Sequence, residues 1–380
     1  MKIAIATTGR FHVLDLAREL SKLGHEVDFW SIVPQNRAVK FGLPLTAHRG
    51  LLPLLFPLVA AQRYGGPTLR EWANPWLLAA VDRLIAHRLE PCDVFIGMSG
   101  ICVDSARVAH DRYGAKIFIE RGSRHILSQK AIMDDLKRCD MSAETVSDYA
   151  VERELASYAL ADQVVIPSLH VEHSFLEQGF PAEKLYRNPY GVDFSMFPPT
   201  PAPLEQPATL LFVGTWCYRK GVDLLESTWR KLEGVNLLHV GPVGDAPLPD
   251  HPGFRHVDSM PQWRLSEFYA QAHLFVLASR EEGLSLVQAQ SLASGLPLVC
   301  TDRTGGEDLQ QLLDNPTWVK VVPSDDAGAL TVAVREMLPK ALGLRGVRDL
   351  LGQGREQLTW EAYGGRYDQK LKSVATGDAY

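Results

Sequence analysis

Two short segments in the second half of the chain carry residues suited to binding a diphosphate. The first, Arg219-Lys220-Gly221, lies between an apolar run that ends at Gly214 and an amphipathic stretch that begins at Val222. A loop that leads from a strand into a helix presents free backbone N–H groups to an anion. Arginine adds bidentate contacts and lysine adds a point charge. The spacing alone fits an exposed basic pair before a helix equally well.

The second segment is residues 282–286 (EGLSL), at an expected turn from a strand into a helix. Here a carboxylate stands beside the free N–H groups of a helix N-terminus. The N–H groups suit a phosphate, and the carboxylate of Glu282 can accept hydrogen bonds from sugar hydroxyls. Residue chemistry alone slightly favours a simpler interpretation, in which Glu282 lies in the first turn of the helix and stabilises it.

The elements around these segments alternate between short apolar strands and amphipathic helices. Strands are expected at residues 2–8, 27–33, 93–98, 116–120 and 163–167, and again at 209–214, 236–241, 274–278 and 298–300. Five prolines in the ten residues 198–207 indicate a stiff linker between the two series. The pattern predicts an α/β fold of two Rossmann-like domains, with parallel sheets facing each other across a ligand cleft. A final helix at about residues 354–374 fits either domain.

Composition excludes several classes of protein. The 380 residues are 46% hydrophobic and 22% charged, which argues against a disordered chain or a disulfide scaffold. A net charge of −6 argues against general nucleic-acid binding. The five cysteines form no C-x-x-C pair, as expected of a reduced, cytoplasmic protein. Met1-Lys2 leads directly into a strand without a signal peptide, and no apolar run reaches the ~20 residues of a membrane span.

Several motifs, in order along residues 1–372, resemble family 4 glycosyltransferases of the GT-B fold. Residues 282–284 (EGL) are followed by a polar residue eight positions after Glu282, then by residues 293–297 (ASGLP) and 305–307 (GGE). Residues 219–221 resemble the phosphate-binding segment of the family, and residues 158–168, 188–193 and 24–27 agree with it. Residues 359–361 (TWE) resemble the start of its C-terminal helix. The resemblance implies an N-terminal acceptor domain of residues 1–195, a donor domain of residues 205–355, and a helix at about 356–380 that crosses back to the first domain.

The resemblance also implies the reaction and its residues. The reaction is transfer of a sugar from a nucleotide diphosphate sugar, UDP- or GDP-linked, with retention at the anomeric carbon and without a metal or cofactor; the chain also lacks a D-x-D motif. Protein cations would neutralise the leaving diphosphate. The implied catalytic residues are Arg219, Lys220, Glu282, Arg121 and His125. The implied donor-binding residues are Gly214, Thr215, Gly241, Met260, Gly283, Leu284, Ser285, Leu286 and Gln290.

Three positions depart from the family pattern. Gln290 replaces a glutamate that usually binds ribose, so altered nucleotide affinity is expected. Thr215 replaces an arginine, which leaves Arg219 as the substitute cation. Arg121-Gly122 replaces His-Gly in the first domain, and whether Arg121 or His125 contacts the donor sugar stays open.

The acceptor is expected at Gly9, Arg10, His12 and Ser99, because a glycine after the first strand lets the backbone approach the cleft. His12 has an alternative role as an exposed residue at a helix start, and His125 is as well explained by structure as by function. The apolar run of residues 51–61 is either ordinary packing, the favoured interpretation, or a surface for a lipid-linked acceptor or a peripheral membrane contact.

The sequence leaves three alternatives to the transferase. A non-catalytic or partner-dependent GT-B subunit is supported by Gln290 and Thr215, and opposed by intact Glu282, Arg219 and Lys220. A sugar-nucleotide epimerase would release free nucleotide without a glycosylated product. An NAD-dependent dehydrogenase is disfavoured, since the first strand–helix turn lacks G-x-G-x-x-G.

Overall fold

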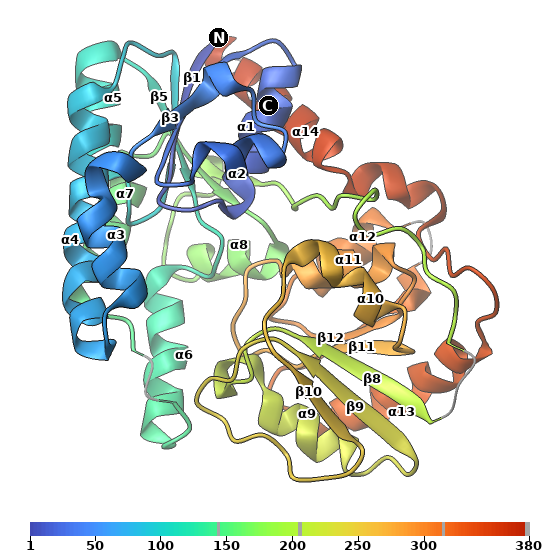
Figure 1. The fold of residues 1–380 in the computed structure, drawn as a ribbon. Coiled ribbons are helices and arrows are strands. Elements are labelled where there is room, and N and C mark those ends of the chain that lie inside the picture. Colours follow the sequence, from blue (N-terminus) through green and yellow to red (C-terminus); the bar gives the residue numbers. More distant parts are fainter. Residues whose placement is uncertain (143–144, 204–206, 314–315, 377–380) are drawn as a thin grey trace.

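The chain folds into two α/β domains, each built on a fully parallel sheet (Figure 1). The computed structural model describes residues 1–142, 145–203, 207–313 and 316–376. Outside this range lie part of the proline-rich linker, the last four residues, and residue 144, where the sequence predicts the start of a long helix.

The N-terminal domain holds a seven-stranded sheet in the order β3-β2-β1-β4-β5-β6-β7. Its order reverses between β1 and β4, so the loops after these two strands diverge and leave room for a ligand. Buried aliphatic residues fill the strands, as expected for a sheet covered on both faces. The strands are β1 (Lys2–Ala6), β2 (Glu26–Ser31), β3 (His48–Gly50), β4 (Val94–Met98), β5 (Lys116–Glu120), β6 (Gln163–Ile166) and β7 (Leu185–Arg187). The helices are α1 (Phe11–Lys22), α2 (Gln35–Lys40), α3 (Leu52–Tyr64), α4 (Pro67–Arg88), α5 (Val103–Tyr113), α6 (Ile126–Arg138), α7 (Asp148–Leu160) and α8 (Leu169–Leu176).

The C-terminal domain repeats this plan with six strands in the order β10-β9-β8-β11-β12-β13. Here the order reverses between β8 and β11, the two strands that precede the basic and acidic segments. The strands are β8 (Ala208–Val213), β9 (Val235–Val240), β10 (Phe254–Val257), β11 (Leu274–Leu277), β12 (Leu298–Thr301) and β13 (Val319–Val322). The helices are α9 (Val222–Trp229), α10 (Ser266–Tyr269), α11 (Leu286–Ala293), α12 (Gly306–Leu312) and α13 (Ala327–Gly343). The last described helix is α14 (Trp360–Thr376).

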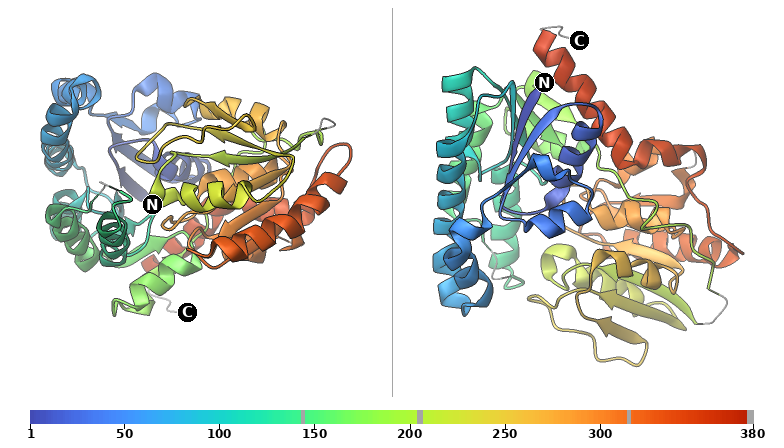
Figure 2. Two further views of the ribbon diagram at one scale, coloured as in Figure 1. Left: turned by 90° about the horizontal axis from the view of Figure 1, so that it is seen from below. Right: turned by 45° about the horizontal axis from the view of Figure 1, so that its top comes forward.

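Two stretches of chain connect the domains, an outgoing one after β7 and a returning one before α14. Val192 bridges Thr359 and Pro201 bridges Val347, so these two stretches lie side by side. Helix α14 then packs on α1 of the N-terminal domain, where His25 Nε2 lies 2.9 Å from Asp368 Oδ1 (Figure 2). The last helix therefore completes the N-terminal domain.

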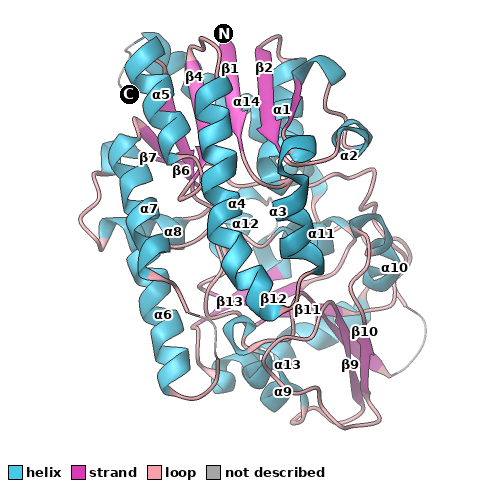
Figure 3. Ribbon diagram, turned by 60° about the vertical axis from the view of Figure 1, so that its left-hand side comes forward, coloured by secondary structure: helices cyan, strands magenta, loops and turns pink. Residues whose placement is uncertain are grey.

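The apolar run of residues 51–61 forms most of α3, which pairs with α4 at the edge of the N-terminal domain (Figure 3). Ordinary packing, the favoured interpretation, accounts for Leu51 and Leu55, which are buried. It does not account for Leu54 and Phe56, which are 49% and 60% exposed. Within the described residues, no helix has the length and apolar character needed to cross a membrane.

Candidate active site

The two segments that carry the cations and the carboxylate meet at the point where the strand order of the C-terminal sheet reverses. They follow β8 and β11, which are neighbours, so their loops leave the same edge of the sheet. Gly221 has a φ of +65°, and a Cβ at this position would lie 2.0 Å from the carbonyl oxygen of Ala278. Glycine is therefore needed for the loops to approach each other, and Arg280 N donates to Arg219 O at 2.9 Å.

Each predicted cation lies beside a carboxylate of the opposite loop. Lys220 forms an ion pair with Glu282. Arg219 Nη1 donates to the carbonyl oxygen of Glu281 at 3.2 Å and lies 3.4 Å from its Oε2. The structure thus brings together Arg219, Lys220 and Glu282, three of the residues predicted for the site.

Arg280 fixes the shape of both loops, a role that the sequence analysis missed. Its buried guanidinium binds the carboxylate of Asp223 at 2.7 and 2.8 Å and the carbonyl oxygen of Tyr218 at 2.7 Å. Its Nε donates to Asp325 at 2.6 Å. A planar group with five donors can hold several acceptors at fixed angles. The sequence signal that could have revealed this role is the position of Arg280 immediately before the pair Glu281-Glu282.

A cavity of about 500 Å³ opens between these loops and the N-terminal domain. This volume is within the range of ligand sites. Its lining from the C-terminal domain includes Arg219, Glu282 and Gly283, and the facing wall includes Ser123 and Gln129.

At Gly283 the backbones of the two domains approach each other closely. A Cβ at this position would lie 1.9 Å from the carbonyl oxygen of Gly122. The carbonyl oxygen of Gly283 accepts hydrogen bonds from Ser168 Oγ at 3.0 Å and from His170 Nε2 at 2.7 Å. Burial lowers the pKa of His170 to about 4. His170 is therefore neutral near pH 7, and its single ring proton is the one donated to Gly283.

Glu281 is a second contact between the domains that the sequence did not reveal. Its buried carboxylate accepts from the hydroxyl of Ser123, and its Oε2 lies 3.4 Å from Nε2 of Gln129. The same oxygen faces Arg219, so Glu281 links a predicted phosphate-binding cation to the opposite domain.

Arg121 and His125 lie beneath the facing wall rather than on it. Arg121 is buried, pairs with Glu154 and donates to Gln129 Oε1 at 2.7 Å. His125 caps α6 and packs against Tyr158 and Phe175, with ring centroids 5.2 and 4.9 Å away. Burial, assisted by the charge of Arg121, lowers the pKa of His125 to about 4. Arg121 reaches the cleft through Gln129, whereas His125 belongs to the aromatic packing of the N-terminal domain.

The remaining predicted donor residues surround the same edge of the C-terminal sheet. Gly214 and Gly241 follow β8 and β9 with φ values of +148° and +149°, and a Cβ on Gly241 would lie 2.1 Å from Gly214 O. Leu284 is buried, and Ser285 precedes the first turn of α11. Gln290 is buried in α11, where its Oε1 accepts from Tyr269 Oη at 3.2 Å. Thr215 lies beside Gly244, and Met260 and Leu286 pack against the core.

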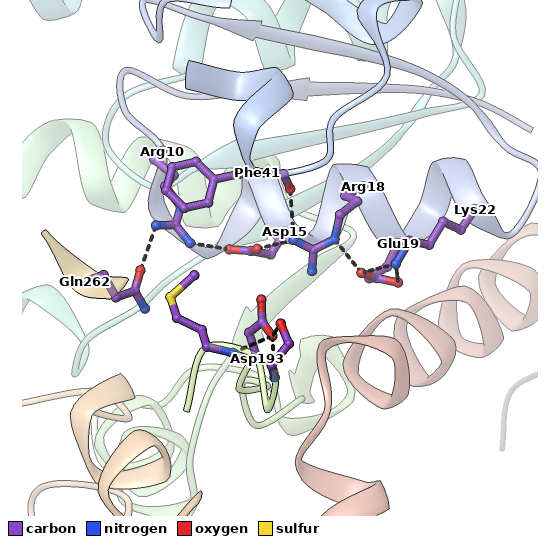
Figure 4. Close-up of polar contacts among 10 residues, drawn as sticks. Arg10, Asp15, Arg18, Glu19, Lys22, Phe41, Asp193 and Gln262 are labelled. Atoms are coloured by element: carbon purple, nitrogen blue, oxygen red, sulfur yellow. Dashed lines mark hydrogen bonds and ion pairs between the residues drawn. The ribbon is translucent and has the colours of Figure 1, made fainter. Parts of the chain in front are cut away.

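Of the four predicted acceptor residues, Arg10 lines a second, smaller cavity of about 210 Å³, together with Asp15 and Gln262 (Figure 4). Arg10 spans the domains there, since its Nη1 donates to Gln262 Oε1 at 2.8 Å and its Nη2 lies 3.3 Å from Asp15. The interpretation of His12 as an exposed residue is wrong: it is 6% exposed and lies 2.8 Å from Glu120 Oε2. Ser99, which directly follows β4, is also buried.

Across the described ranges, no three His, Cys, Asp or Glu side chains are grouped in a way that could hold a metal ion. Ion pairs between the two loops place charged groups at the cleft.

Several solved structures have a similar architecture. The chain aligns with sucrose-phosphate synthase from Thermosynechococcus elongatus at 17% identity and a TM-score of 0.67, covering 100% of both chains. Anabaena HepE in complex with UDP-glucose aligns at 12% identity and 0.63, covering 98% of this chain and 100% of that one. The lipopolysaccharide outer core galactosyltransferase WaaB aligns at 15% and 0.61, with 98% and 100% covered. A comparison of the sequence with curated proteins finds no match.

These structures share the arrangement of two Rossmann-like domains found here, and the chain therefore has the GT-B fold. The match to a protein family lies in the C-terminal domain, which contains both loops of the candidate site. Residues 207–340 match the family described as "Glycosyl transferases group 1".

Proposed function

We propose that the protein is a retaining glycosyltransferase that moves a sugar from a nucleotide diphosphate sugar to a hydroxyl of a glycan or glycolipid. The observation that carries this proposal is that Arg219 and Glu282 line the 500 Å³ cavity, with Lys220 paired to Glu282. The group 1 match covers all three residues.

The chemistry of this corner fits a departing diphosphate. Lys220 is paired with Glu282, and Arg219 with Glu281. A diphosphate bound at the loop would attract both cations, and the N–H groups at the start of α11 would add donors. Glu282, released from Lys220, would then accept hydrogen bonds from hydroxyls of the donor sugar. In this proposal the negative charge that develops on the leaving group is stabilised by protein groups alone.

Retention at the anomeric carbon is part of this proposal. When acceptor and leaving group occupy one face of the sugar, the departing phosphate oxygen can take the acceptor proton, so no separate base is required. HepE has been crystallised with UDP-glucose, and TarM with UDP, which makes a uridine diphosphate sugar the first donor to test, with GDP-linked donors second. A cell-envelope or polysaccharide product fits the bacterial neighbours.

Nucleotide binding provides the direct test. Calorimetry and thermal shift of the full chain against UDP, GDP, ADP, dTDP and CMP, first without metal and then with Mg²⁺, are expected to show selective metal-independent binding of one diphosphate. The matching nucleotide sugar should then be hydrolysed slowly and its anomeric configuration retained in the product. Failure of every nucleotide to bind would contradict the proposal and favour a partner-dependent or non-catalytic subunit, for which buried Gln290 and Thr215 would be responsible. Release of free nucleotide with an epimerised sugar would favour the epimerase.

A further inference from the structure

The helical hairpin of α3 and α4 has an apolar surface that no other part of the described chain covers. The inner face of α4 is buried through Ala73, Leu77, Val81 and Ile85, at the spacing of one helix face. The outer side is also apolar. It carries Leu54, Phe56, Tyr64, Leu69, Trp72 and Trp76, which are 46–79% exposed.

The aromatic members of this surface are arranged as a pair. Trp72 and Trp76 are 57% and 56% exposed, lie one helical turn apart, and have ring centres separated by 6.3 Å. Tyr64, at the end of α3, is 79% exposed. Tryptophan and tyrosine are the residues that concentrate where a protein meets the headgroup region of a membrane. Helices α3 and α4 lie together along one side of the N-terminal domain, so this surface faces outward (Figure 3).

A cavity of about 600 Å³ lies between this hairpin and the loops that follow β1 and β2. Its apolar wall includes Phe56 and Val59 of α3. Among the described residues that line it there are four arginines and no carboxylate. The arginines are Arg10, Arg37, Arg63 and Arg70.

These arginines come from separate elements and surround one space. Arg70 Nε donates to Gln62 O at 3.1 Å, which holds its side chain across the hairpin. Burial lowers the pKa of Arg10; the carboxylate of Asp15 opposes this, and the charge of Arg37 lowers it further. Repulsion between cations around an apolar-walled space is relieved when an anion enters. The cavity thus combines the chemistry of a phosphate site with that of an acyl-chain contact.

We propose that the α3–α4 hairpin docks on a lipid membrane and that the arginine-lined cavity takes the phosphate of an anionic lipid. Trp72, Trp76 and Tyr64 enter the headgroup layer, and the apolar residues of α3 contact the chain of the bound lipid. The lining of the cavity includes Gly9 and Arg10, two of the expected acceptor residues. The further statement that such a lipid carries the sugar acceptor rests on the proposed function, whereas the docking itself does not.

Co-sedimentation of the full chain with vesicles tests this proposal without requiring activity. Vesicles of phosphatidylcholine alone are compared with vesicles that contain 30% phosphatidylglycerol, at low and physiological salt. Binding is expected only to the anionic vesicles and is expected to weaken as salt rises.

Two sets of variants separate the contributions. A triple variant, Arg37→Gln, Arg63→Gln and Arg70→Gln, removes three cations from the cavity. Because each basic residue near an anionic surface contributes about fivefold in binding, the triple variant should bind roughly a hundredfold more weakly. Trp72→Ser with Trp76→Ser should weaken binding by a similar order through loss of apolar insertion. The matched control is Arg107→Gln, Arg138→Gln and Arg264→Gln, three arginines that are 53%, 77% and 54% exposed away from the cavity.

Each outcome decides the question. Preferential loss of binding in the cavity variant and the tryptophan variant supports the proposal. Equal loss in the control variant, undiminished binding by the cavity variant, or absence of vesicle binding by the native chain overturns it. So does binding of inorganic phosphate, measured by calorimetry, without binding of vesicles. The nucleotide screen is unaffected by any of these results, so failure of the membrane proposal and failure of the transferase proposal are distinguishable.

Discussion

Replacing Gly283 with alanine tests whether contact between the domains positions the cleft. The added Cβ would lie 1.9 Å from Gly122 O, whereas ordinary contacts begin at 3.4 Å. The two loops must therefore separate by about 1.5 Å. That movement would stretch the hydrogen bonds from Ser168 and His170, now 3.0 and 2.7 Å, beyond bonding distance.

The expected magnitude follows from these two bonds. At about 1 kcal/mol of net stabilisation each, their loss lowers the ratio of closed to open molecules roughly thirtyfold. A displacement of this size between reacting groups can reduce turnover by about 10². Affinity for the nucleotide diphosphate alone should change little, since Arg219 and Lys220 belong to the C-terminal domain. Small-angle scattering measures domain opening, and calorimetry and turnover measure the two other effects.

Gly365→Ala is the matched control, because a Cβ at this helical position would meet no atom within 4 Å. The reasoning is refuted if Gly283→Ala retains the scattering profile and turnover of the native chain. It is also refuted if the control loses as much activity as the test variant.

Three further predictions concern single side chains. Lys220→Ala should lower turnover by about 10²-fold with an unchanged melting temperature, since it removes charge stabilisation from the leaving group; turnover equal to that of the exposed Lys231→Ala variant would contradict this. Gln290→Glu should raise nucleotide affinity in calorimetry if residue 290 contacts ribose, and unchanged affinity would exclude that contact. The buried, neutral His125, with its pKa near 4, makes the unfolded state bind more protons than the folded state below pH 6.5. Stability should therefore fall by about 2 kcal/mol per such histidine between pH 7 and pH 5. Urea unfolding of His125→Asn should therefore show a smaller loss of stability between pH 7 and pH 5 than the native chain does. If stability falls with pH as steeply in His125→Asn as in the exposed-site variant His110→Asn, the pH dependence does not come from His125.

The alternation of strands and helices predicted both domains, because buried parallel strands and amphipathic helices leave strong local patterns. The juxtaposition of Arg219, Lys220 and Glu282 was also predictable, since the carboxyl ends of neighbouring strands share an edge. Glu281 was missed because its role depends on Ser123 and Gln129, more than 150 residues earlier in the chain.

Burial was the property that the sequence predicted least well. His12 stands at the start of a helix, where exposure is common, yet Glu120 and Tyr190 come from distant strands and loops to enclose it. The apolar residues of α3 show the opposite case. Their apolar composition suggests that they belong to a core. Phe56 is nevertheless exposed, because α3 lies at the edge of the domain. Neither outcome is encoded within a few residues of the position concerned.

The return of α14 to the N-terminal domain has a consequence for synthesis of the protein. Residues 1–187 contain every strand of the first sheet, but the surface of α1 that contacts α14 waits for residues 360–376. On the ribosome, that surface stays uncovered while the whole second domain is translated. Since domains generally fold as units during translation, an incomplete first domain is open to mispairing during this interval. Nascent chains stalled before residue 360 should therefore recruit chaperones to α1, and chains released after residue 376 should not.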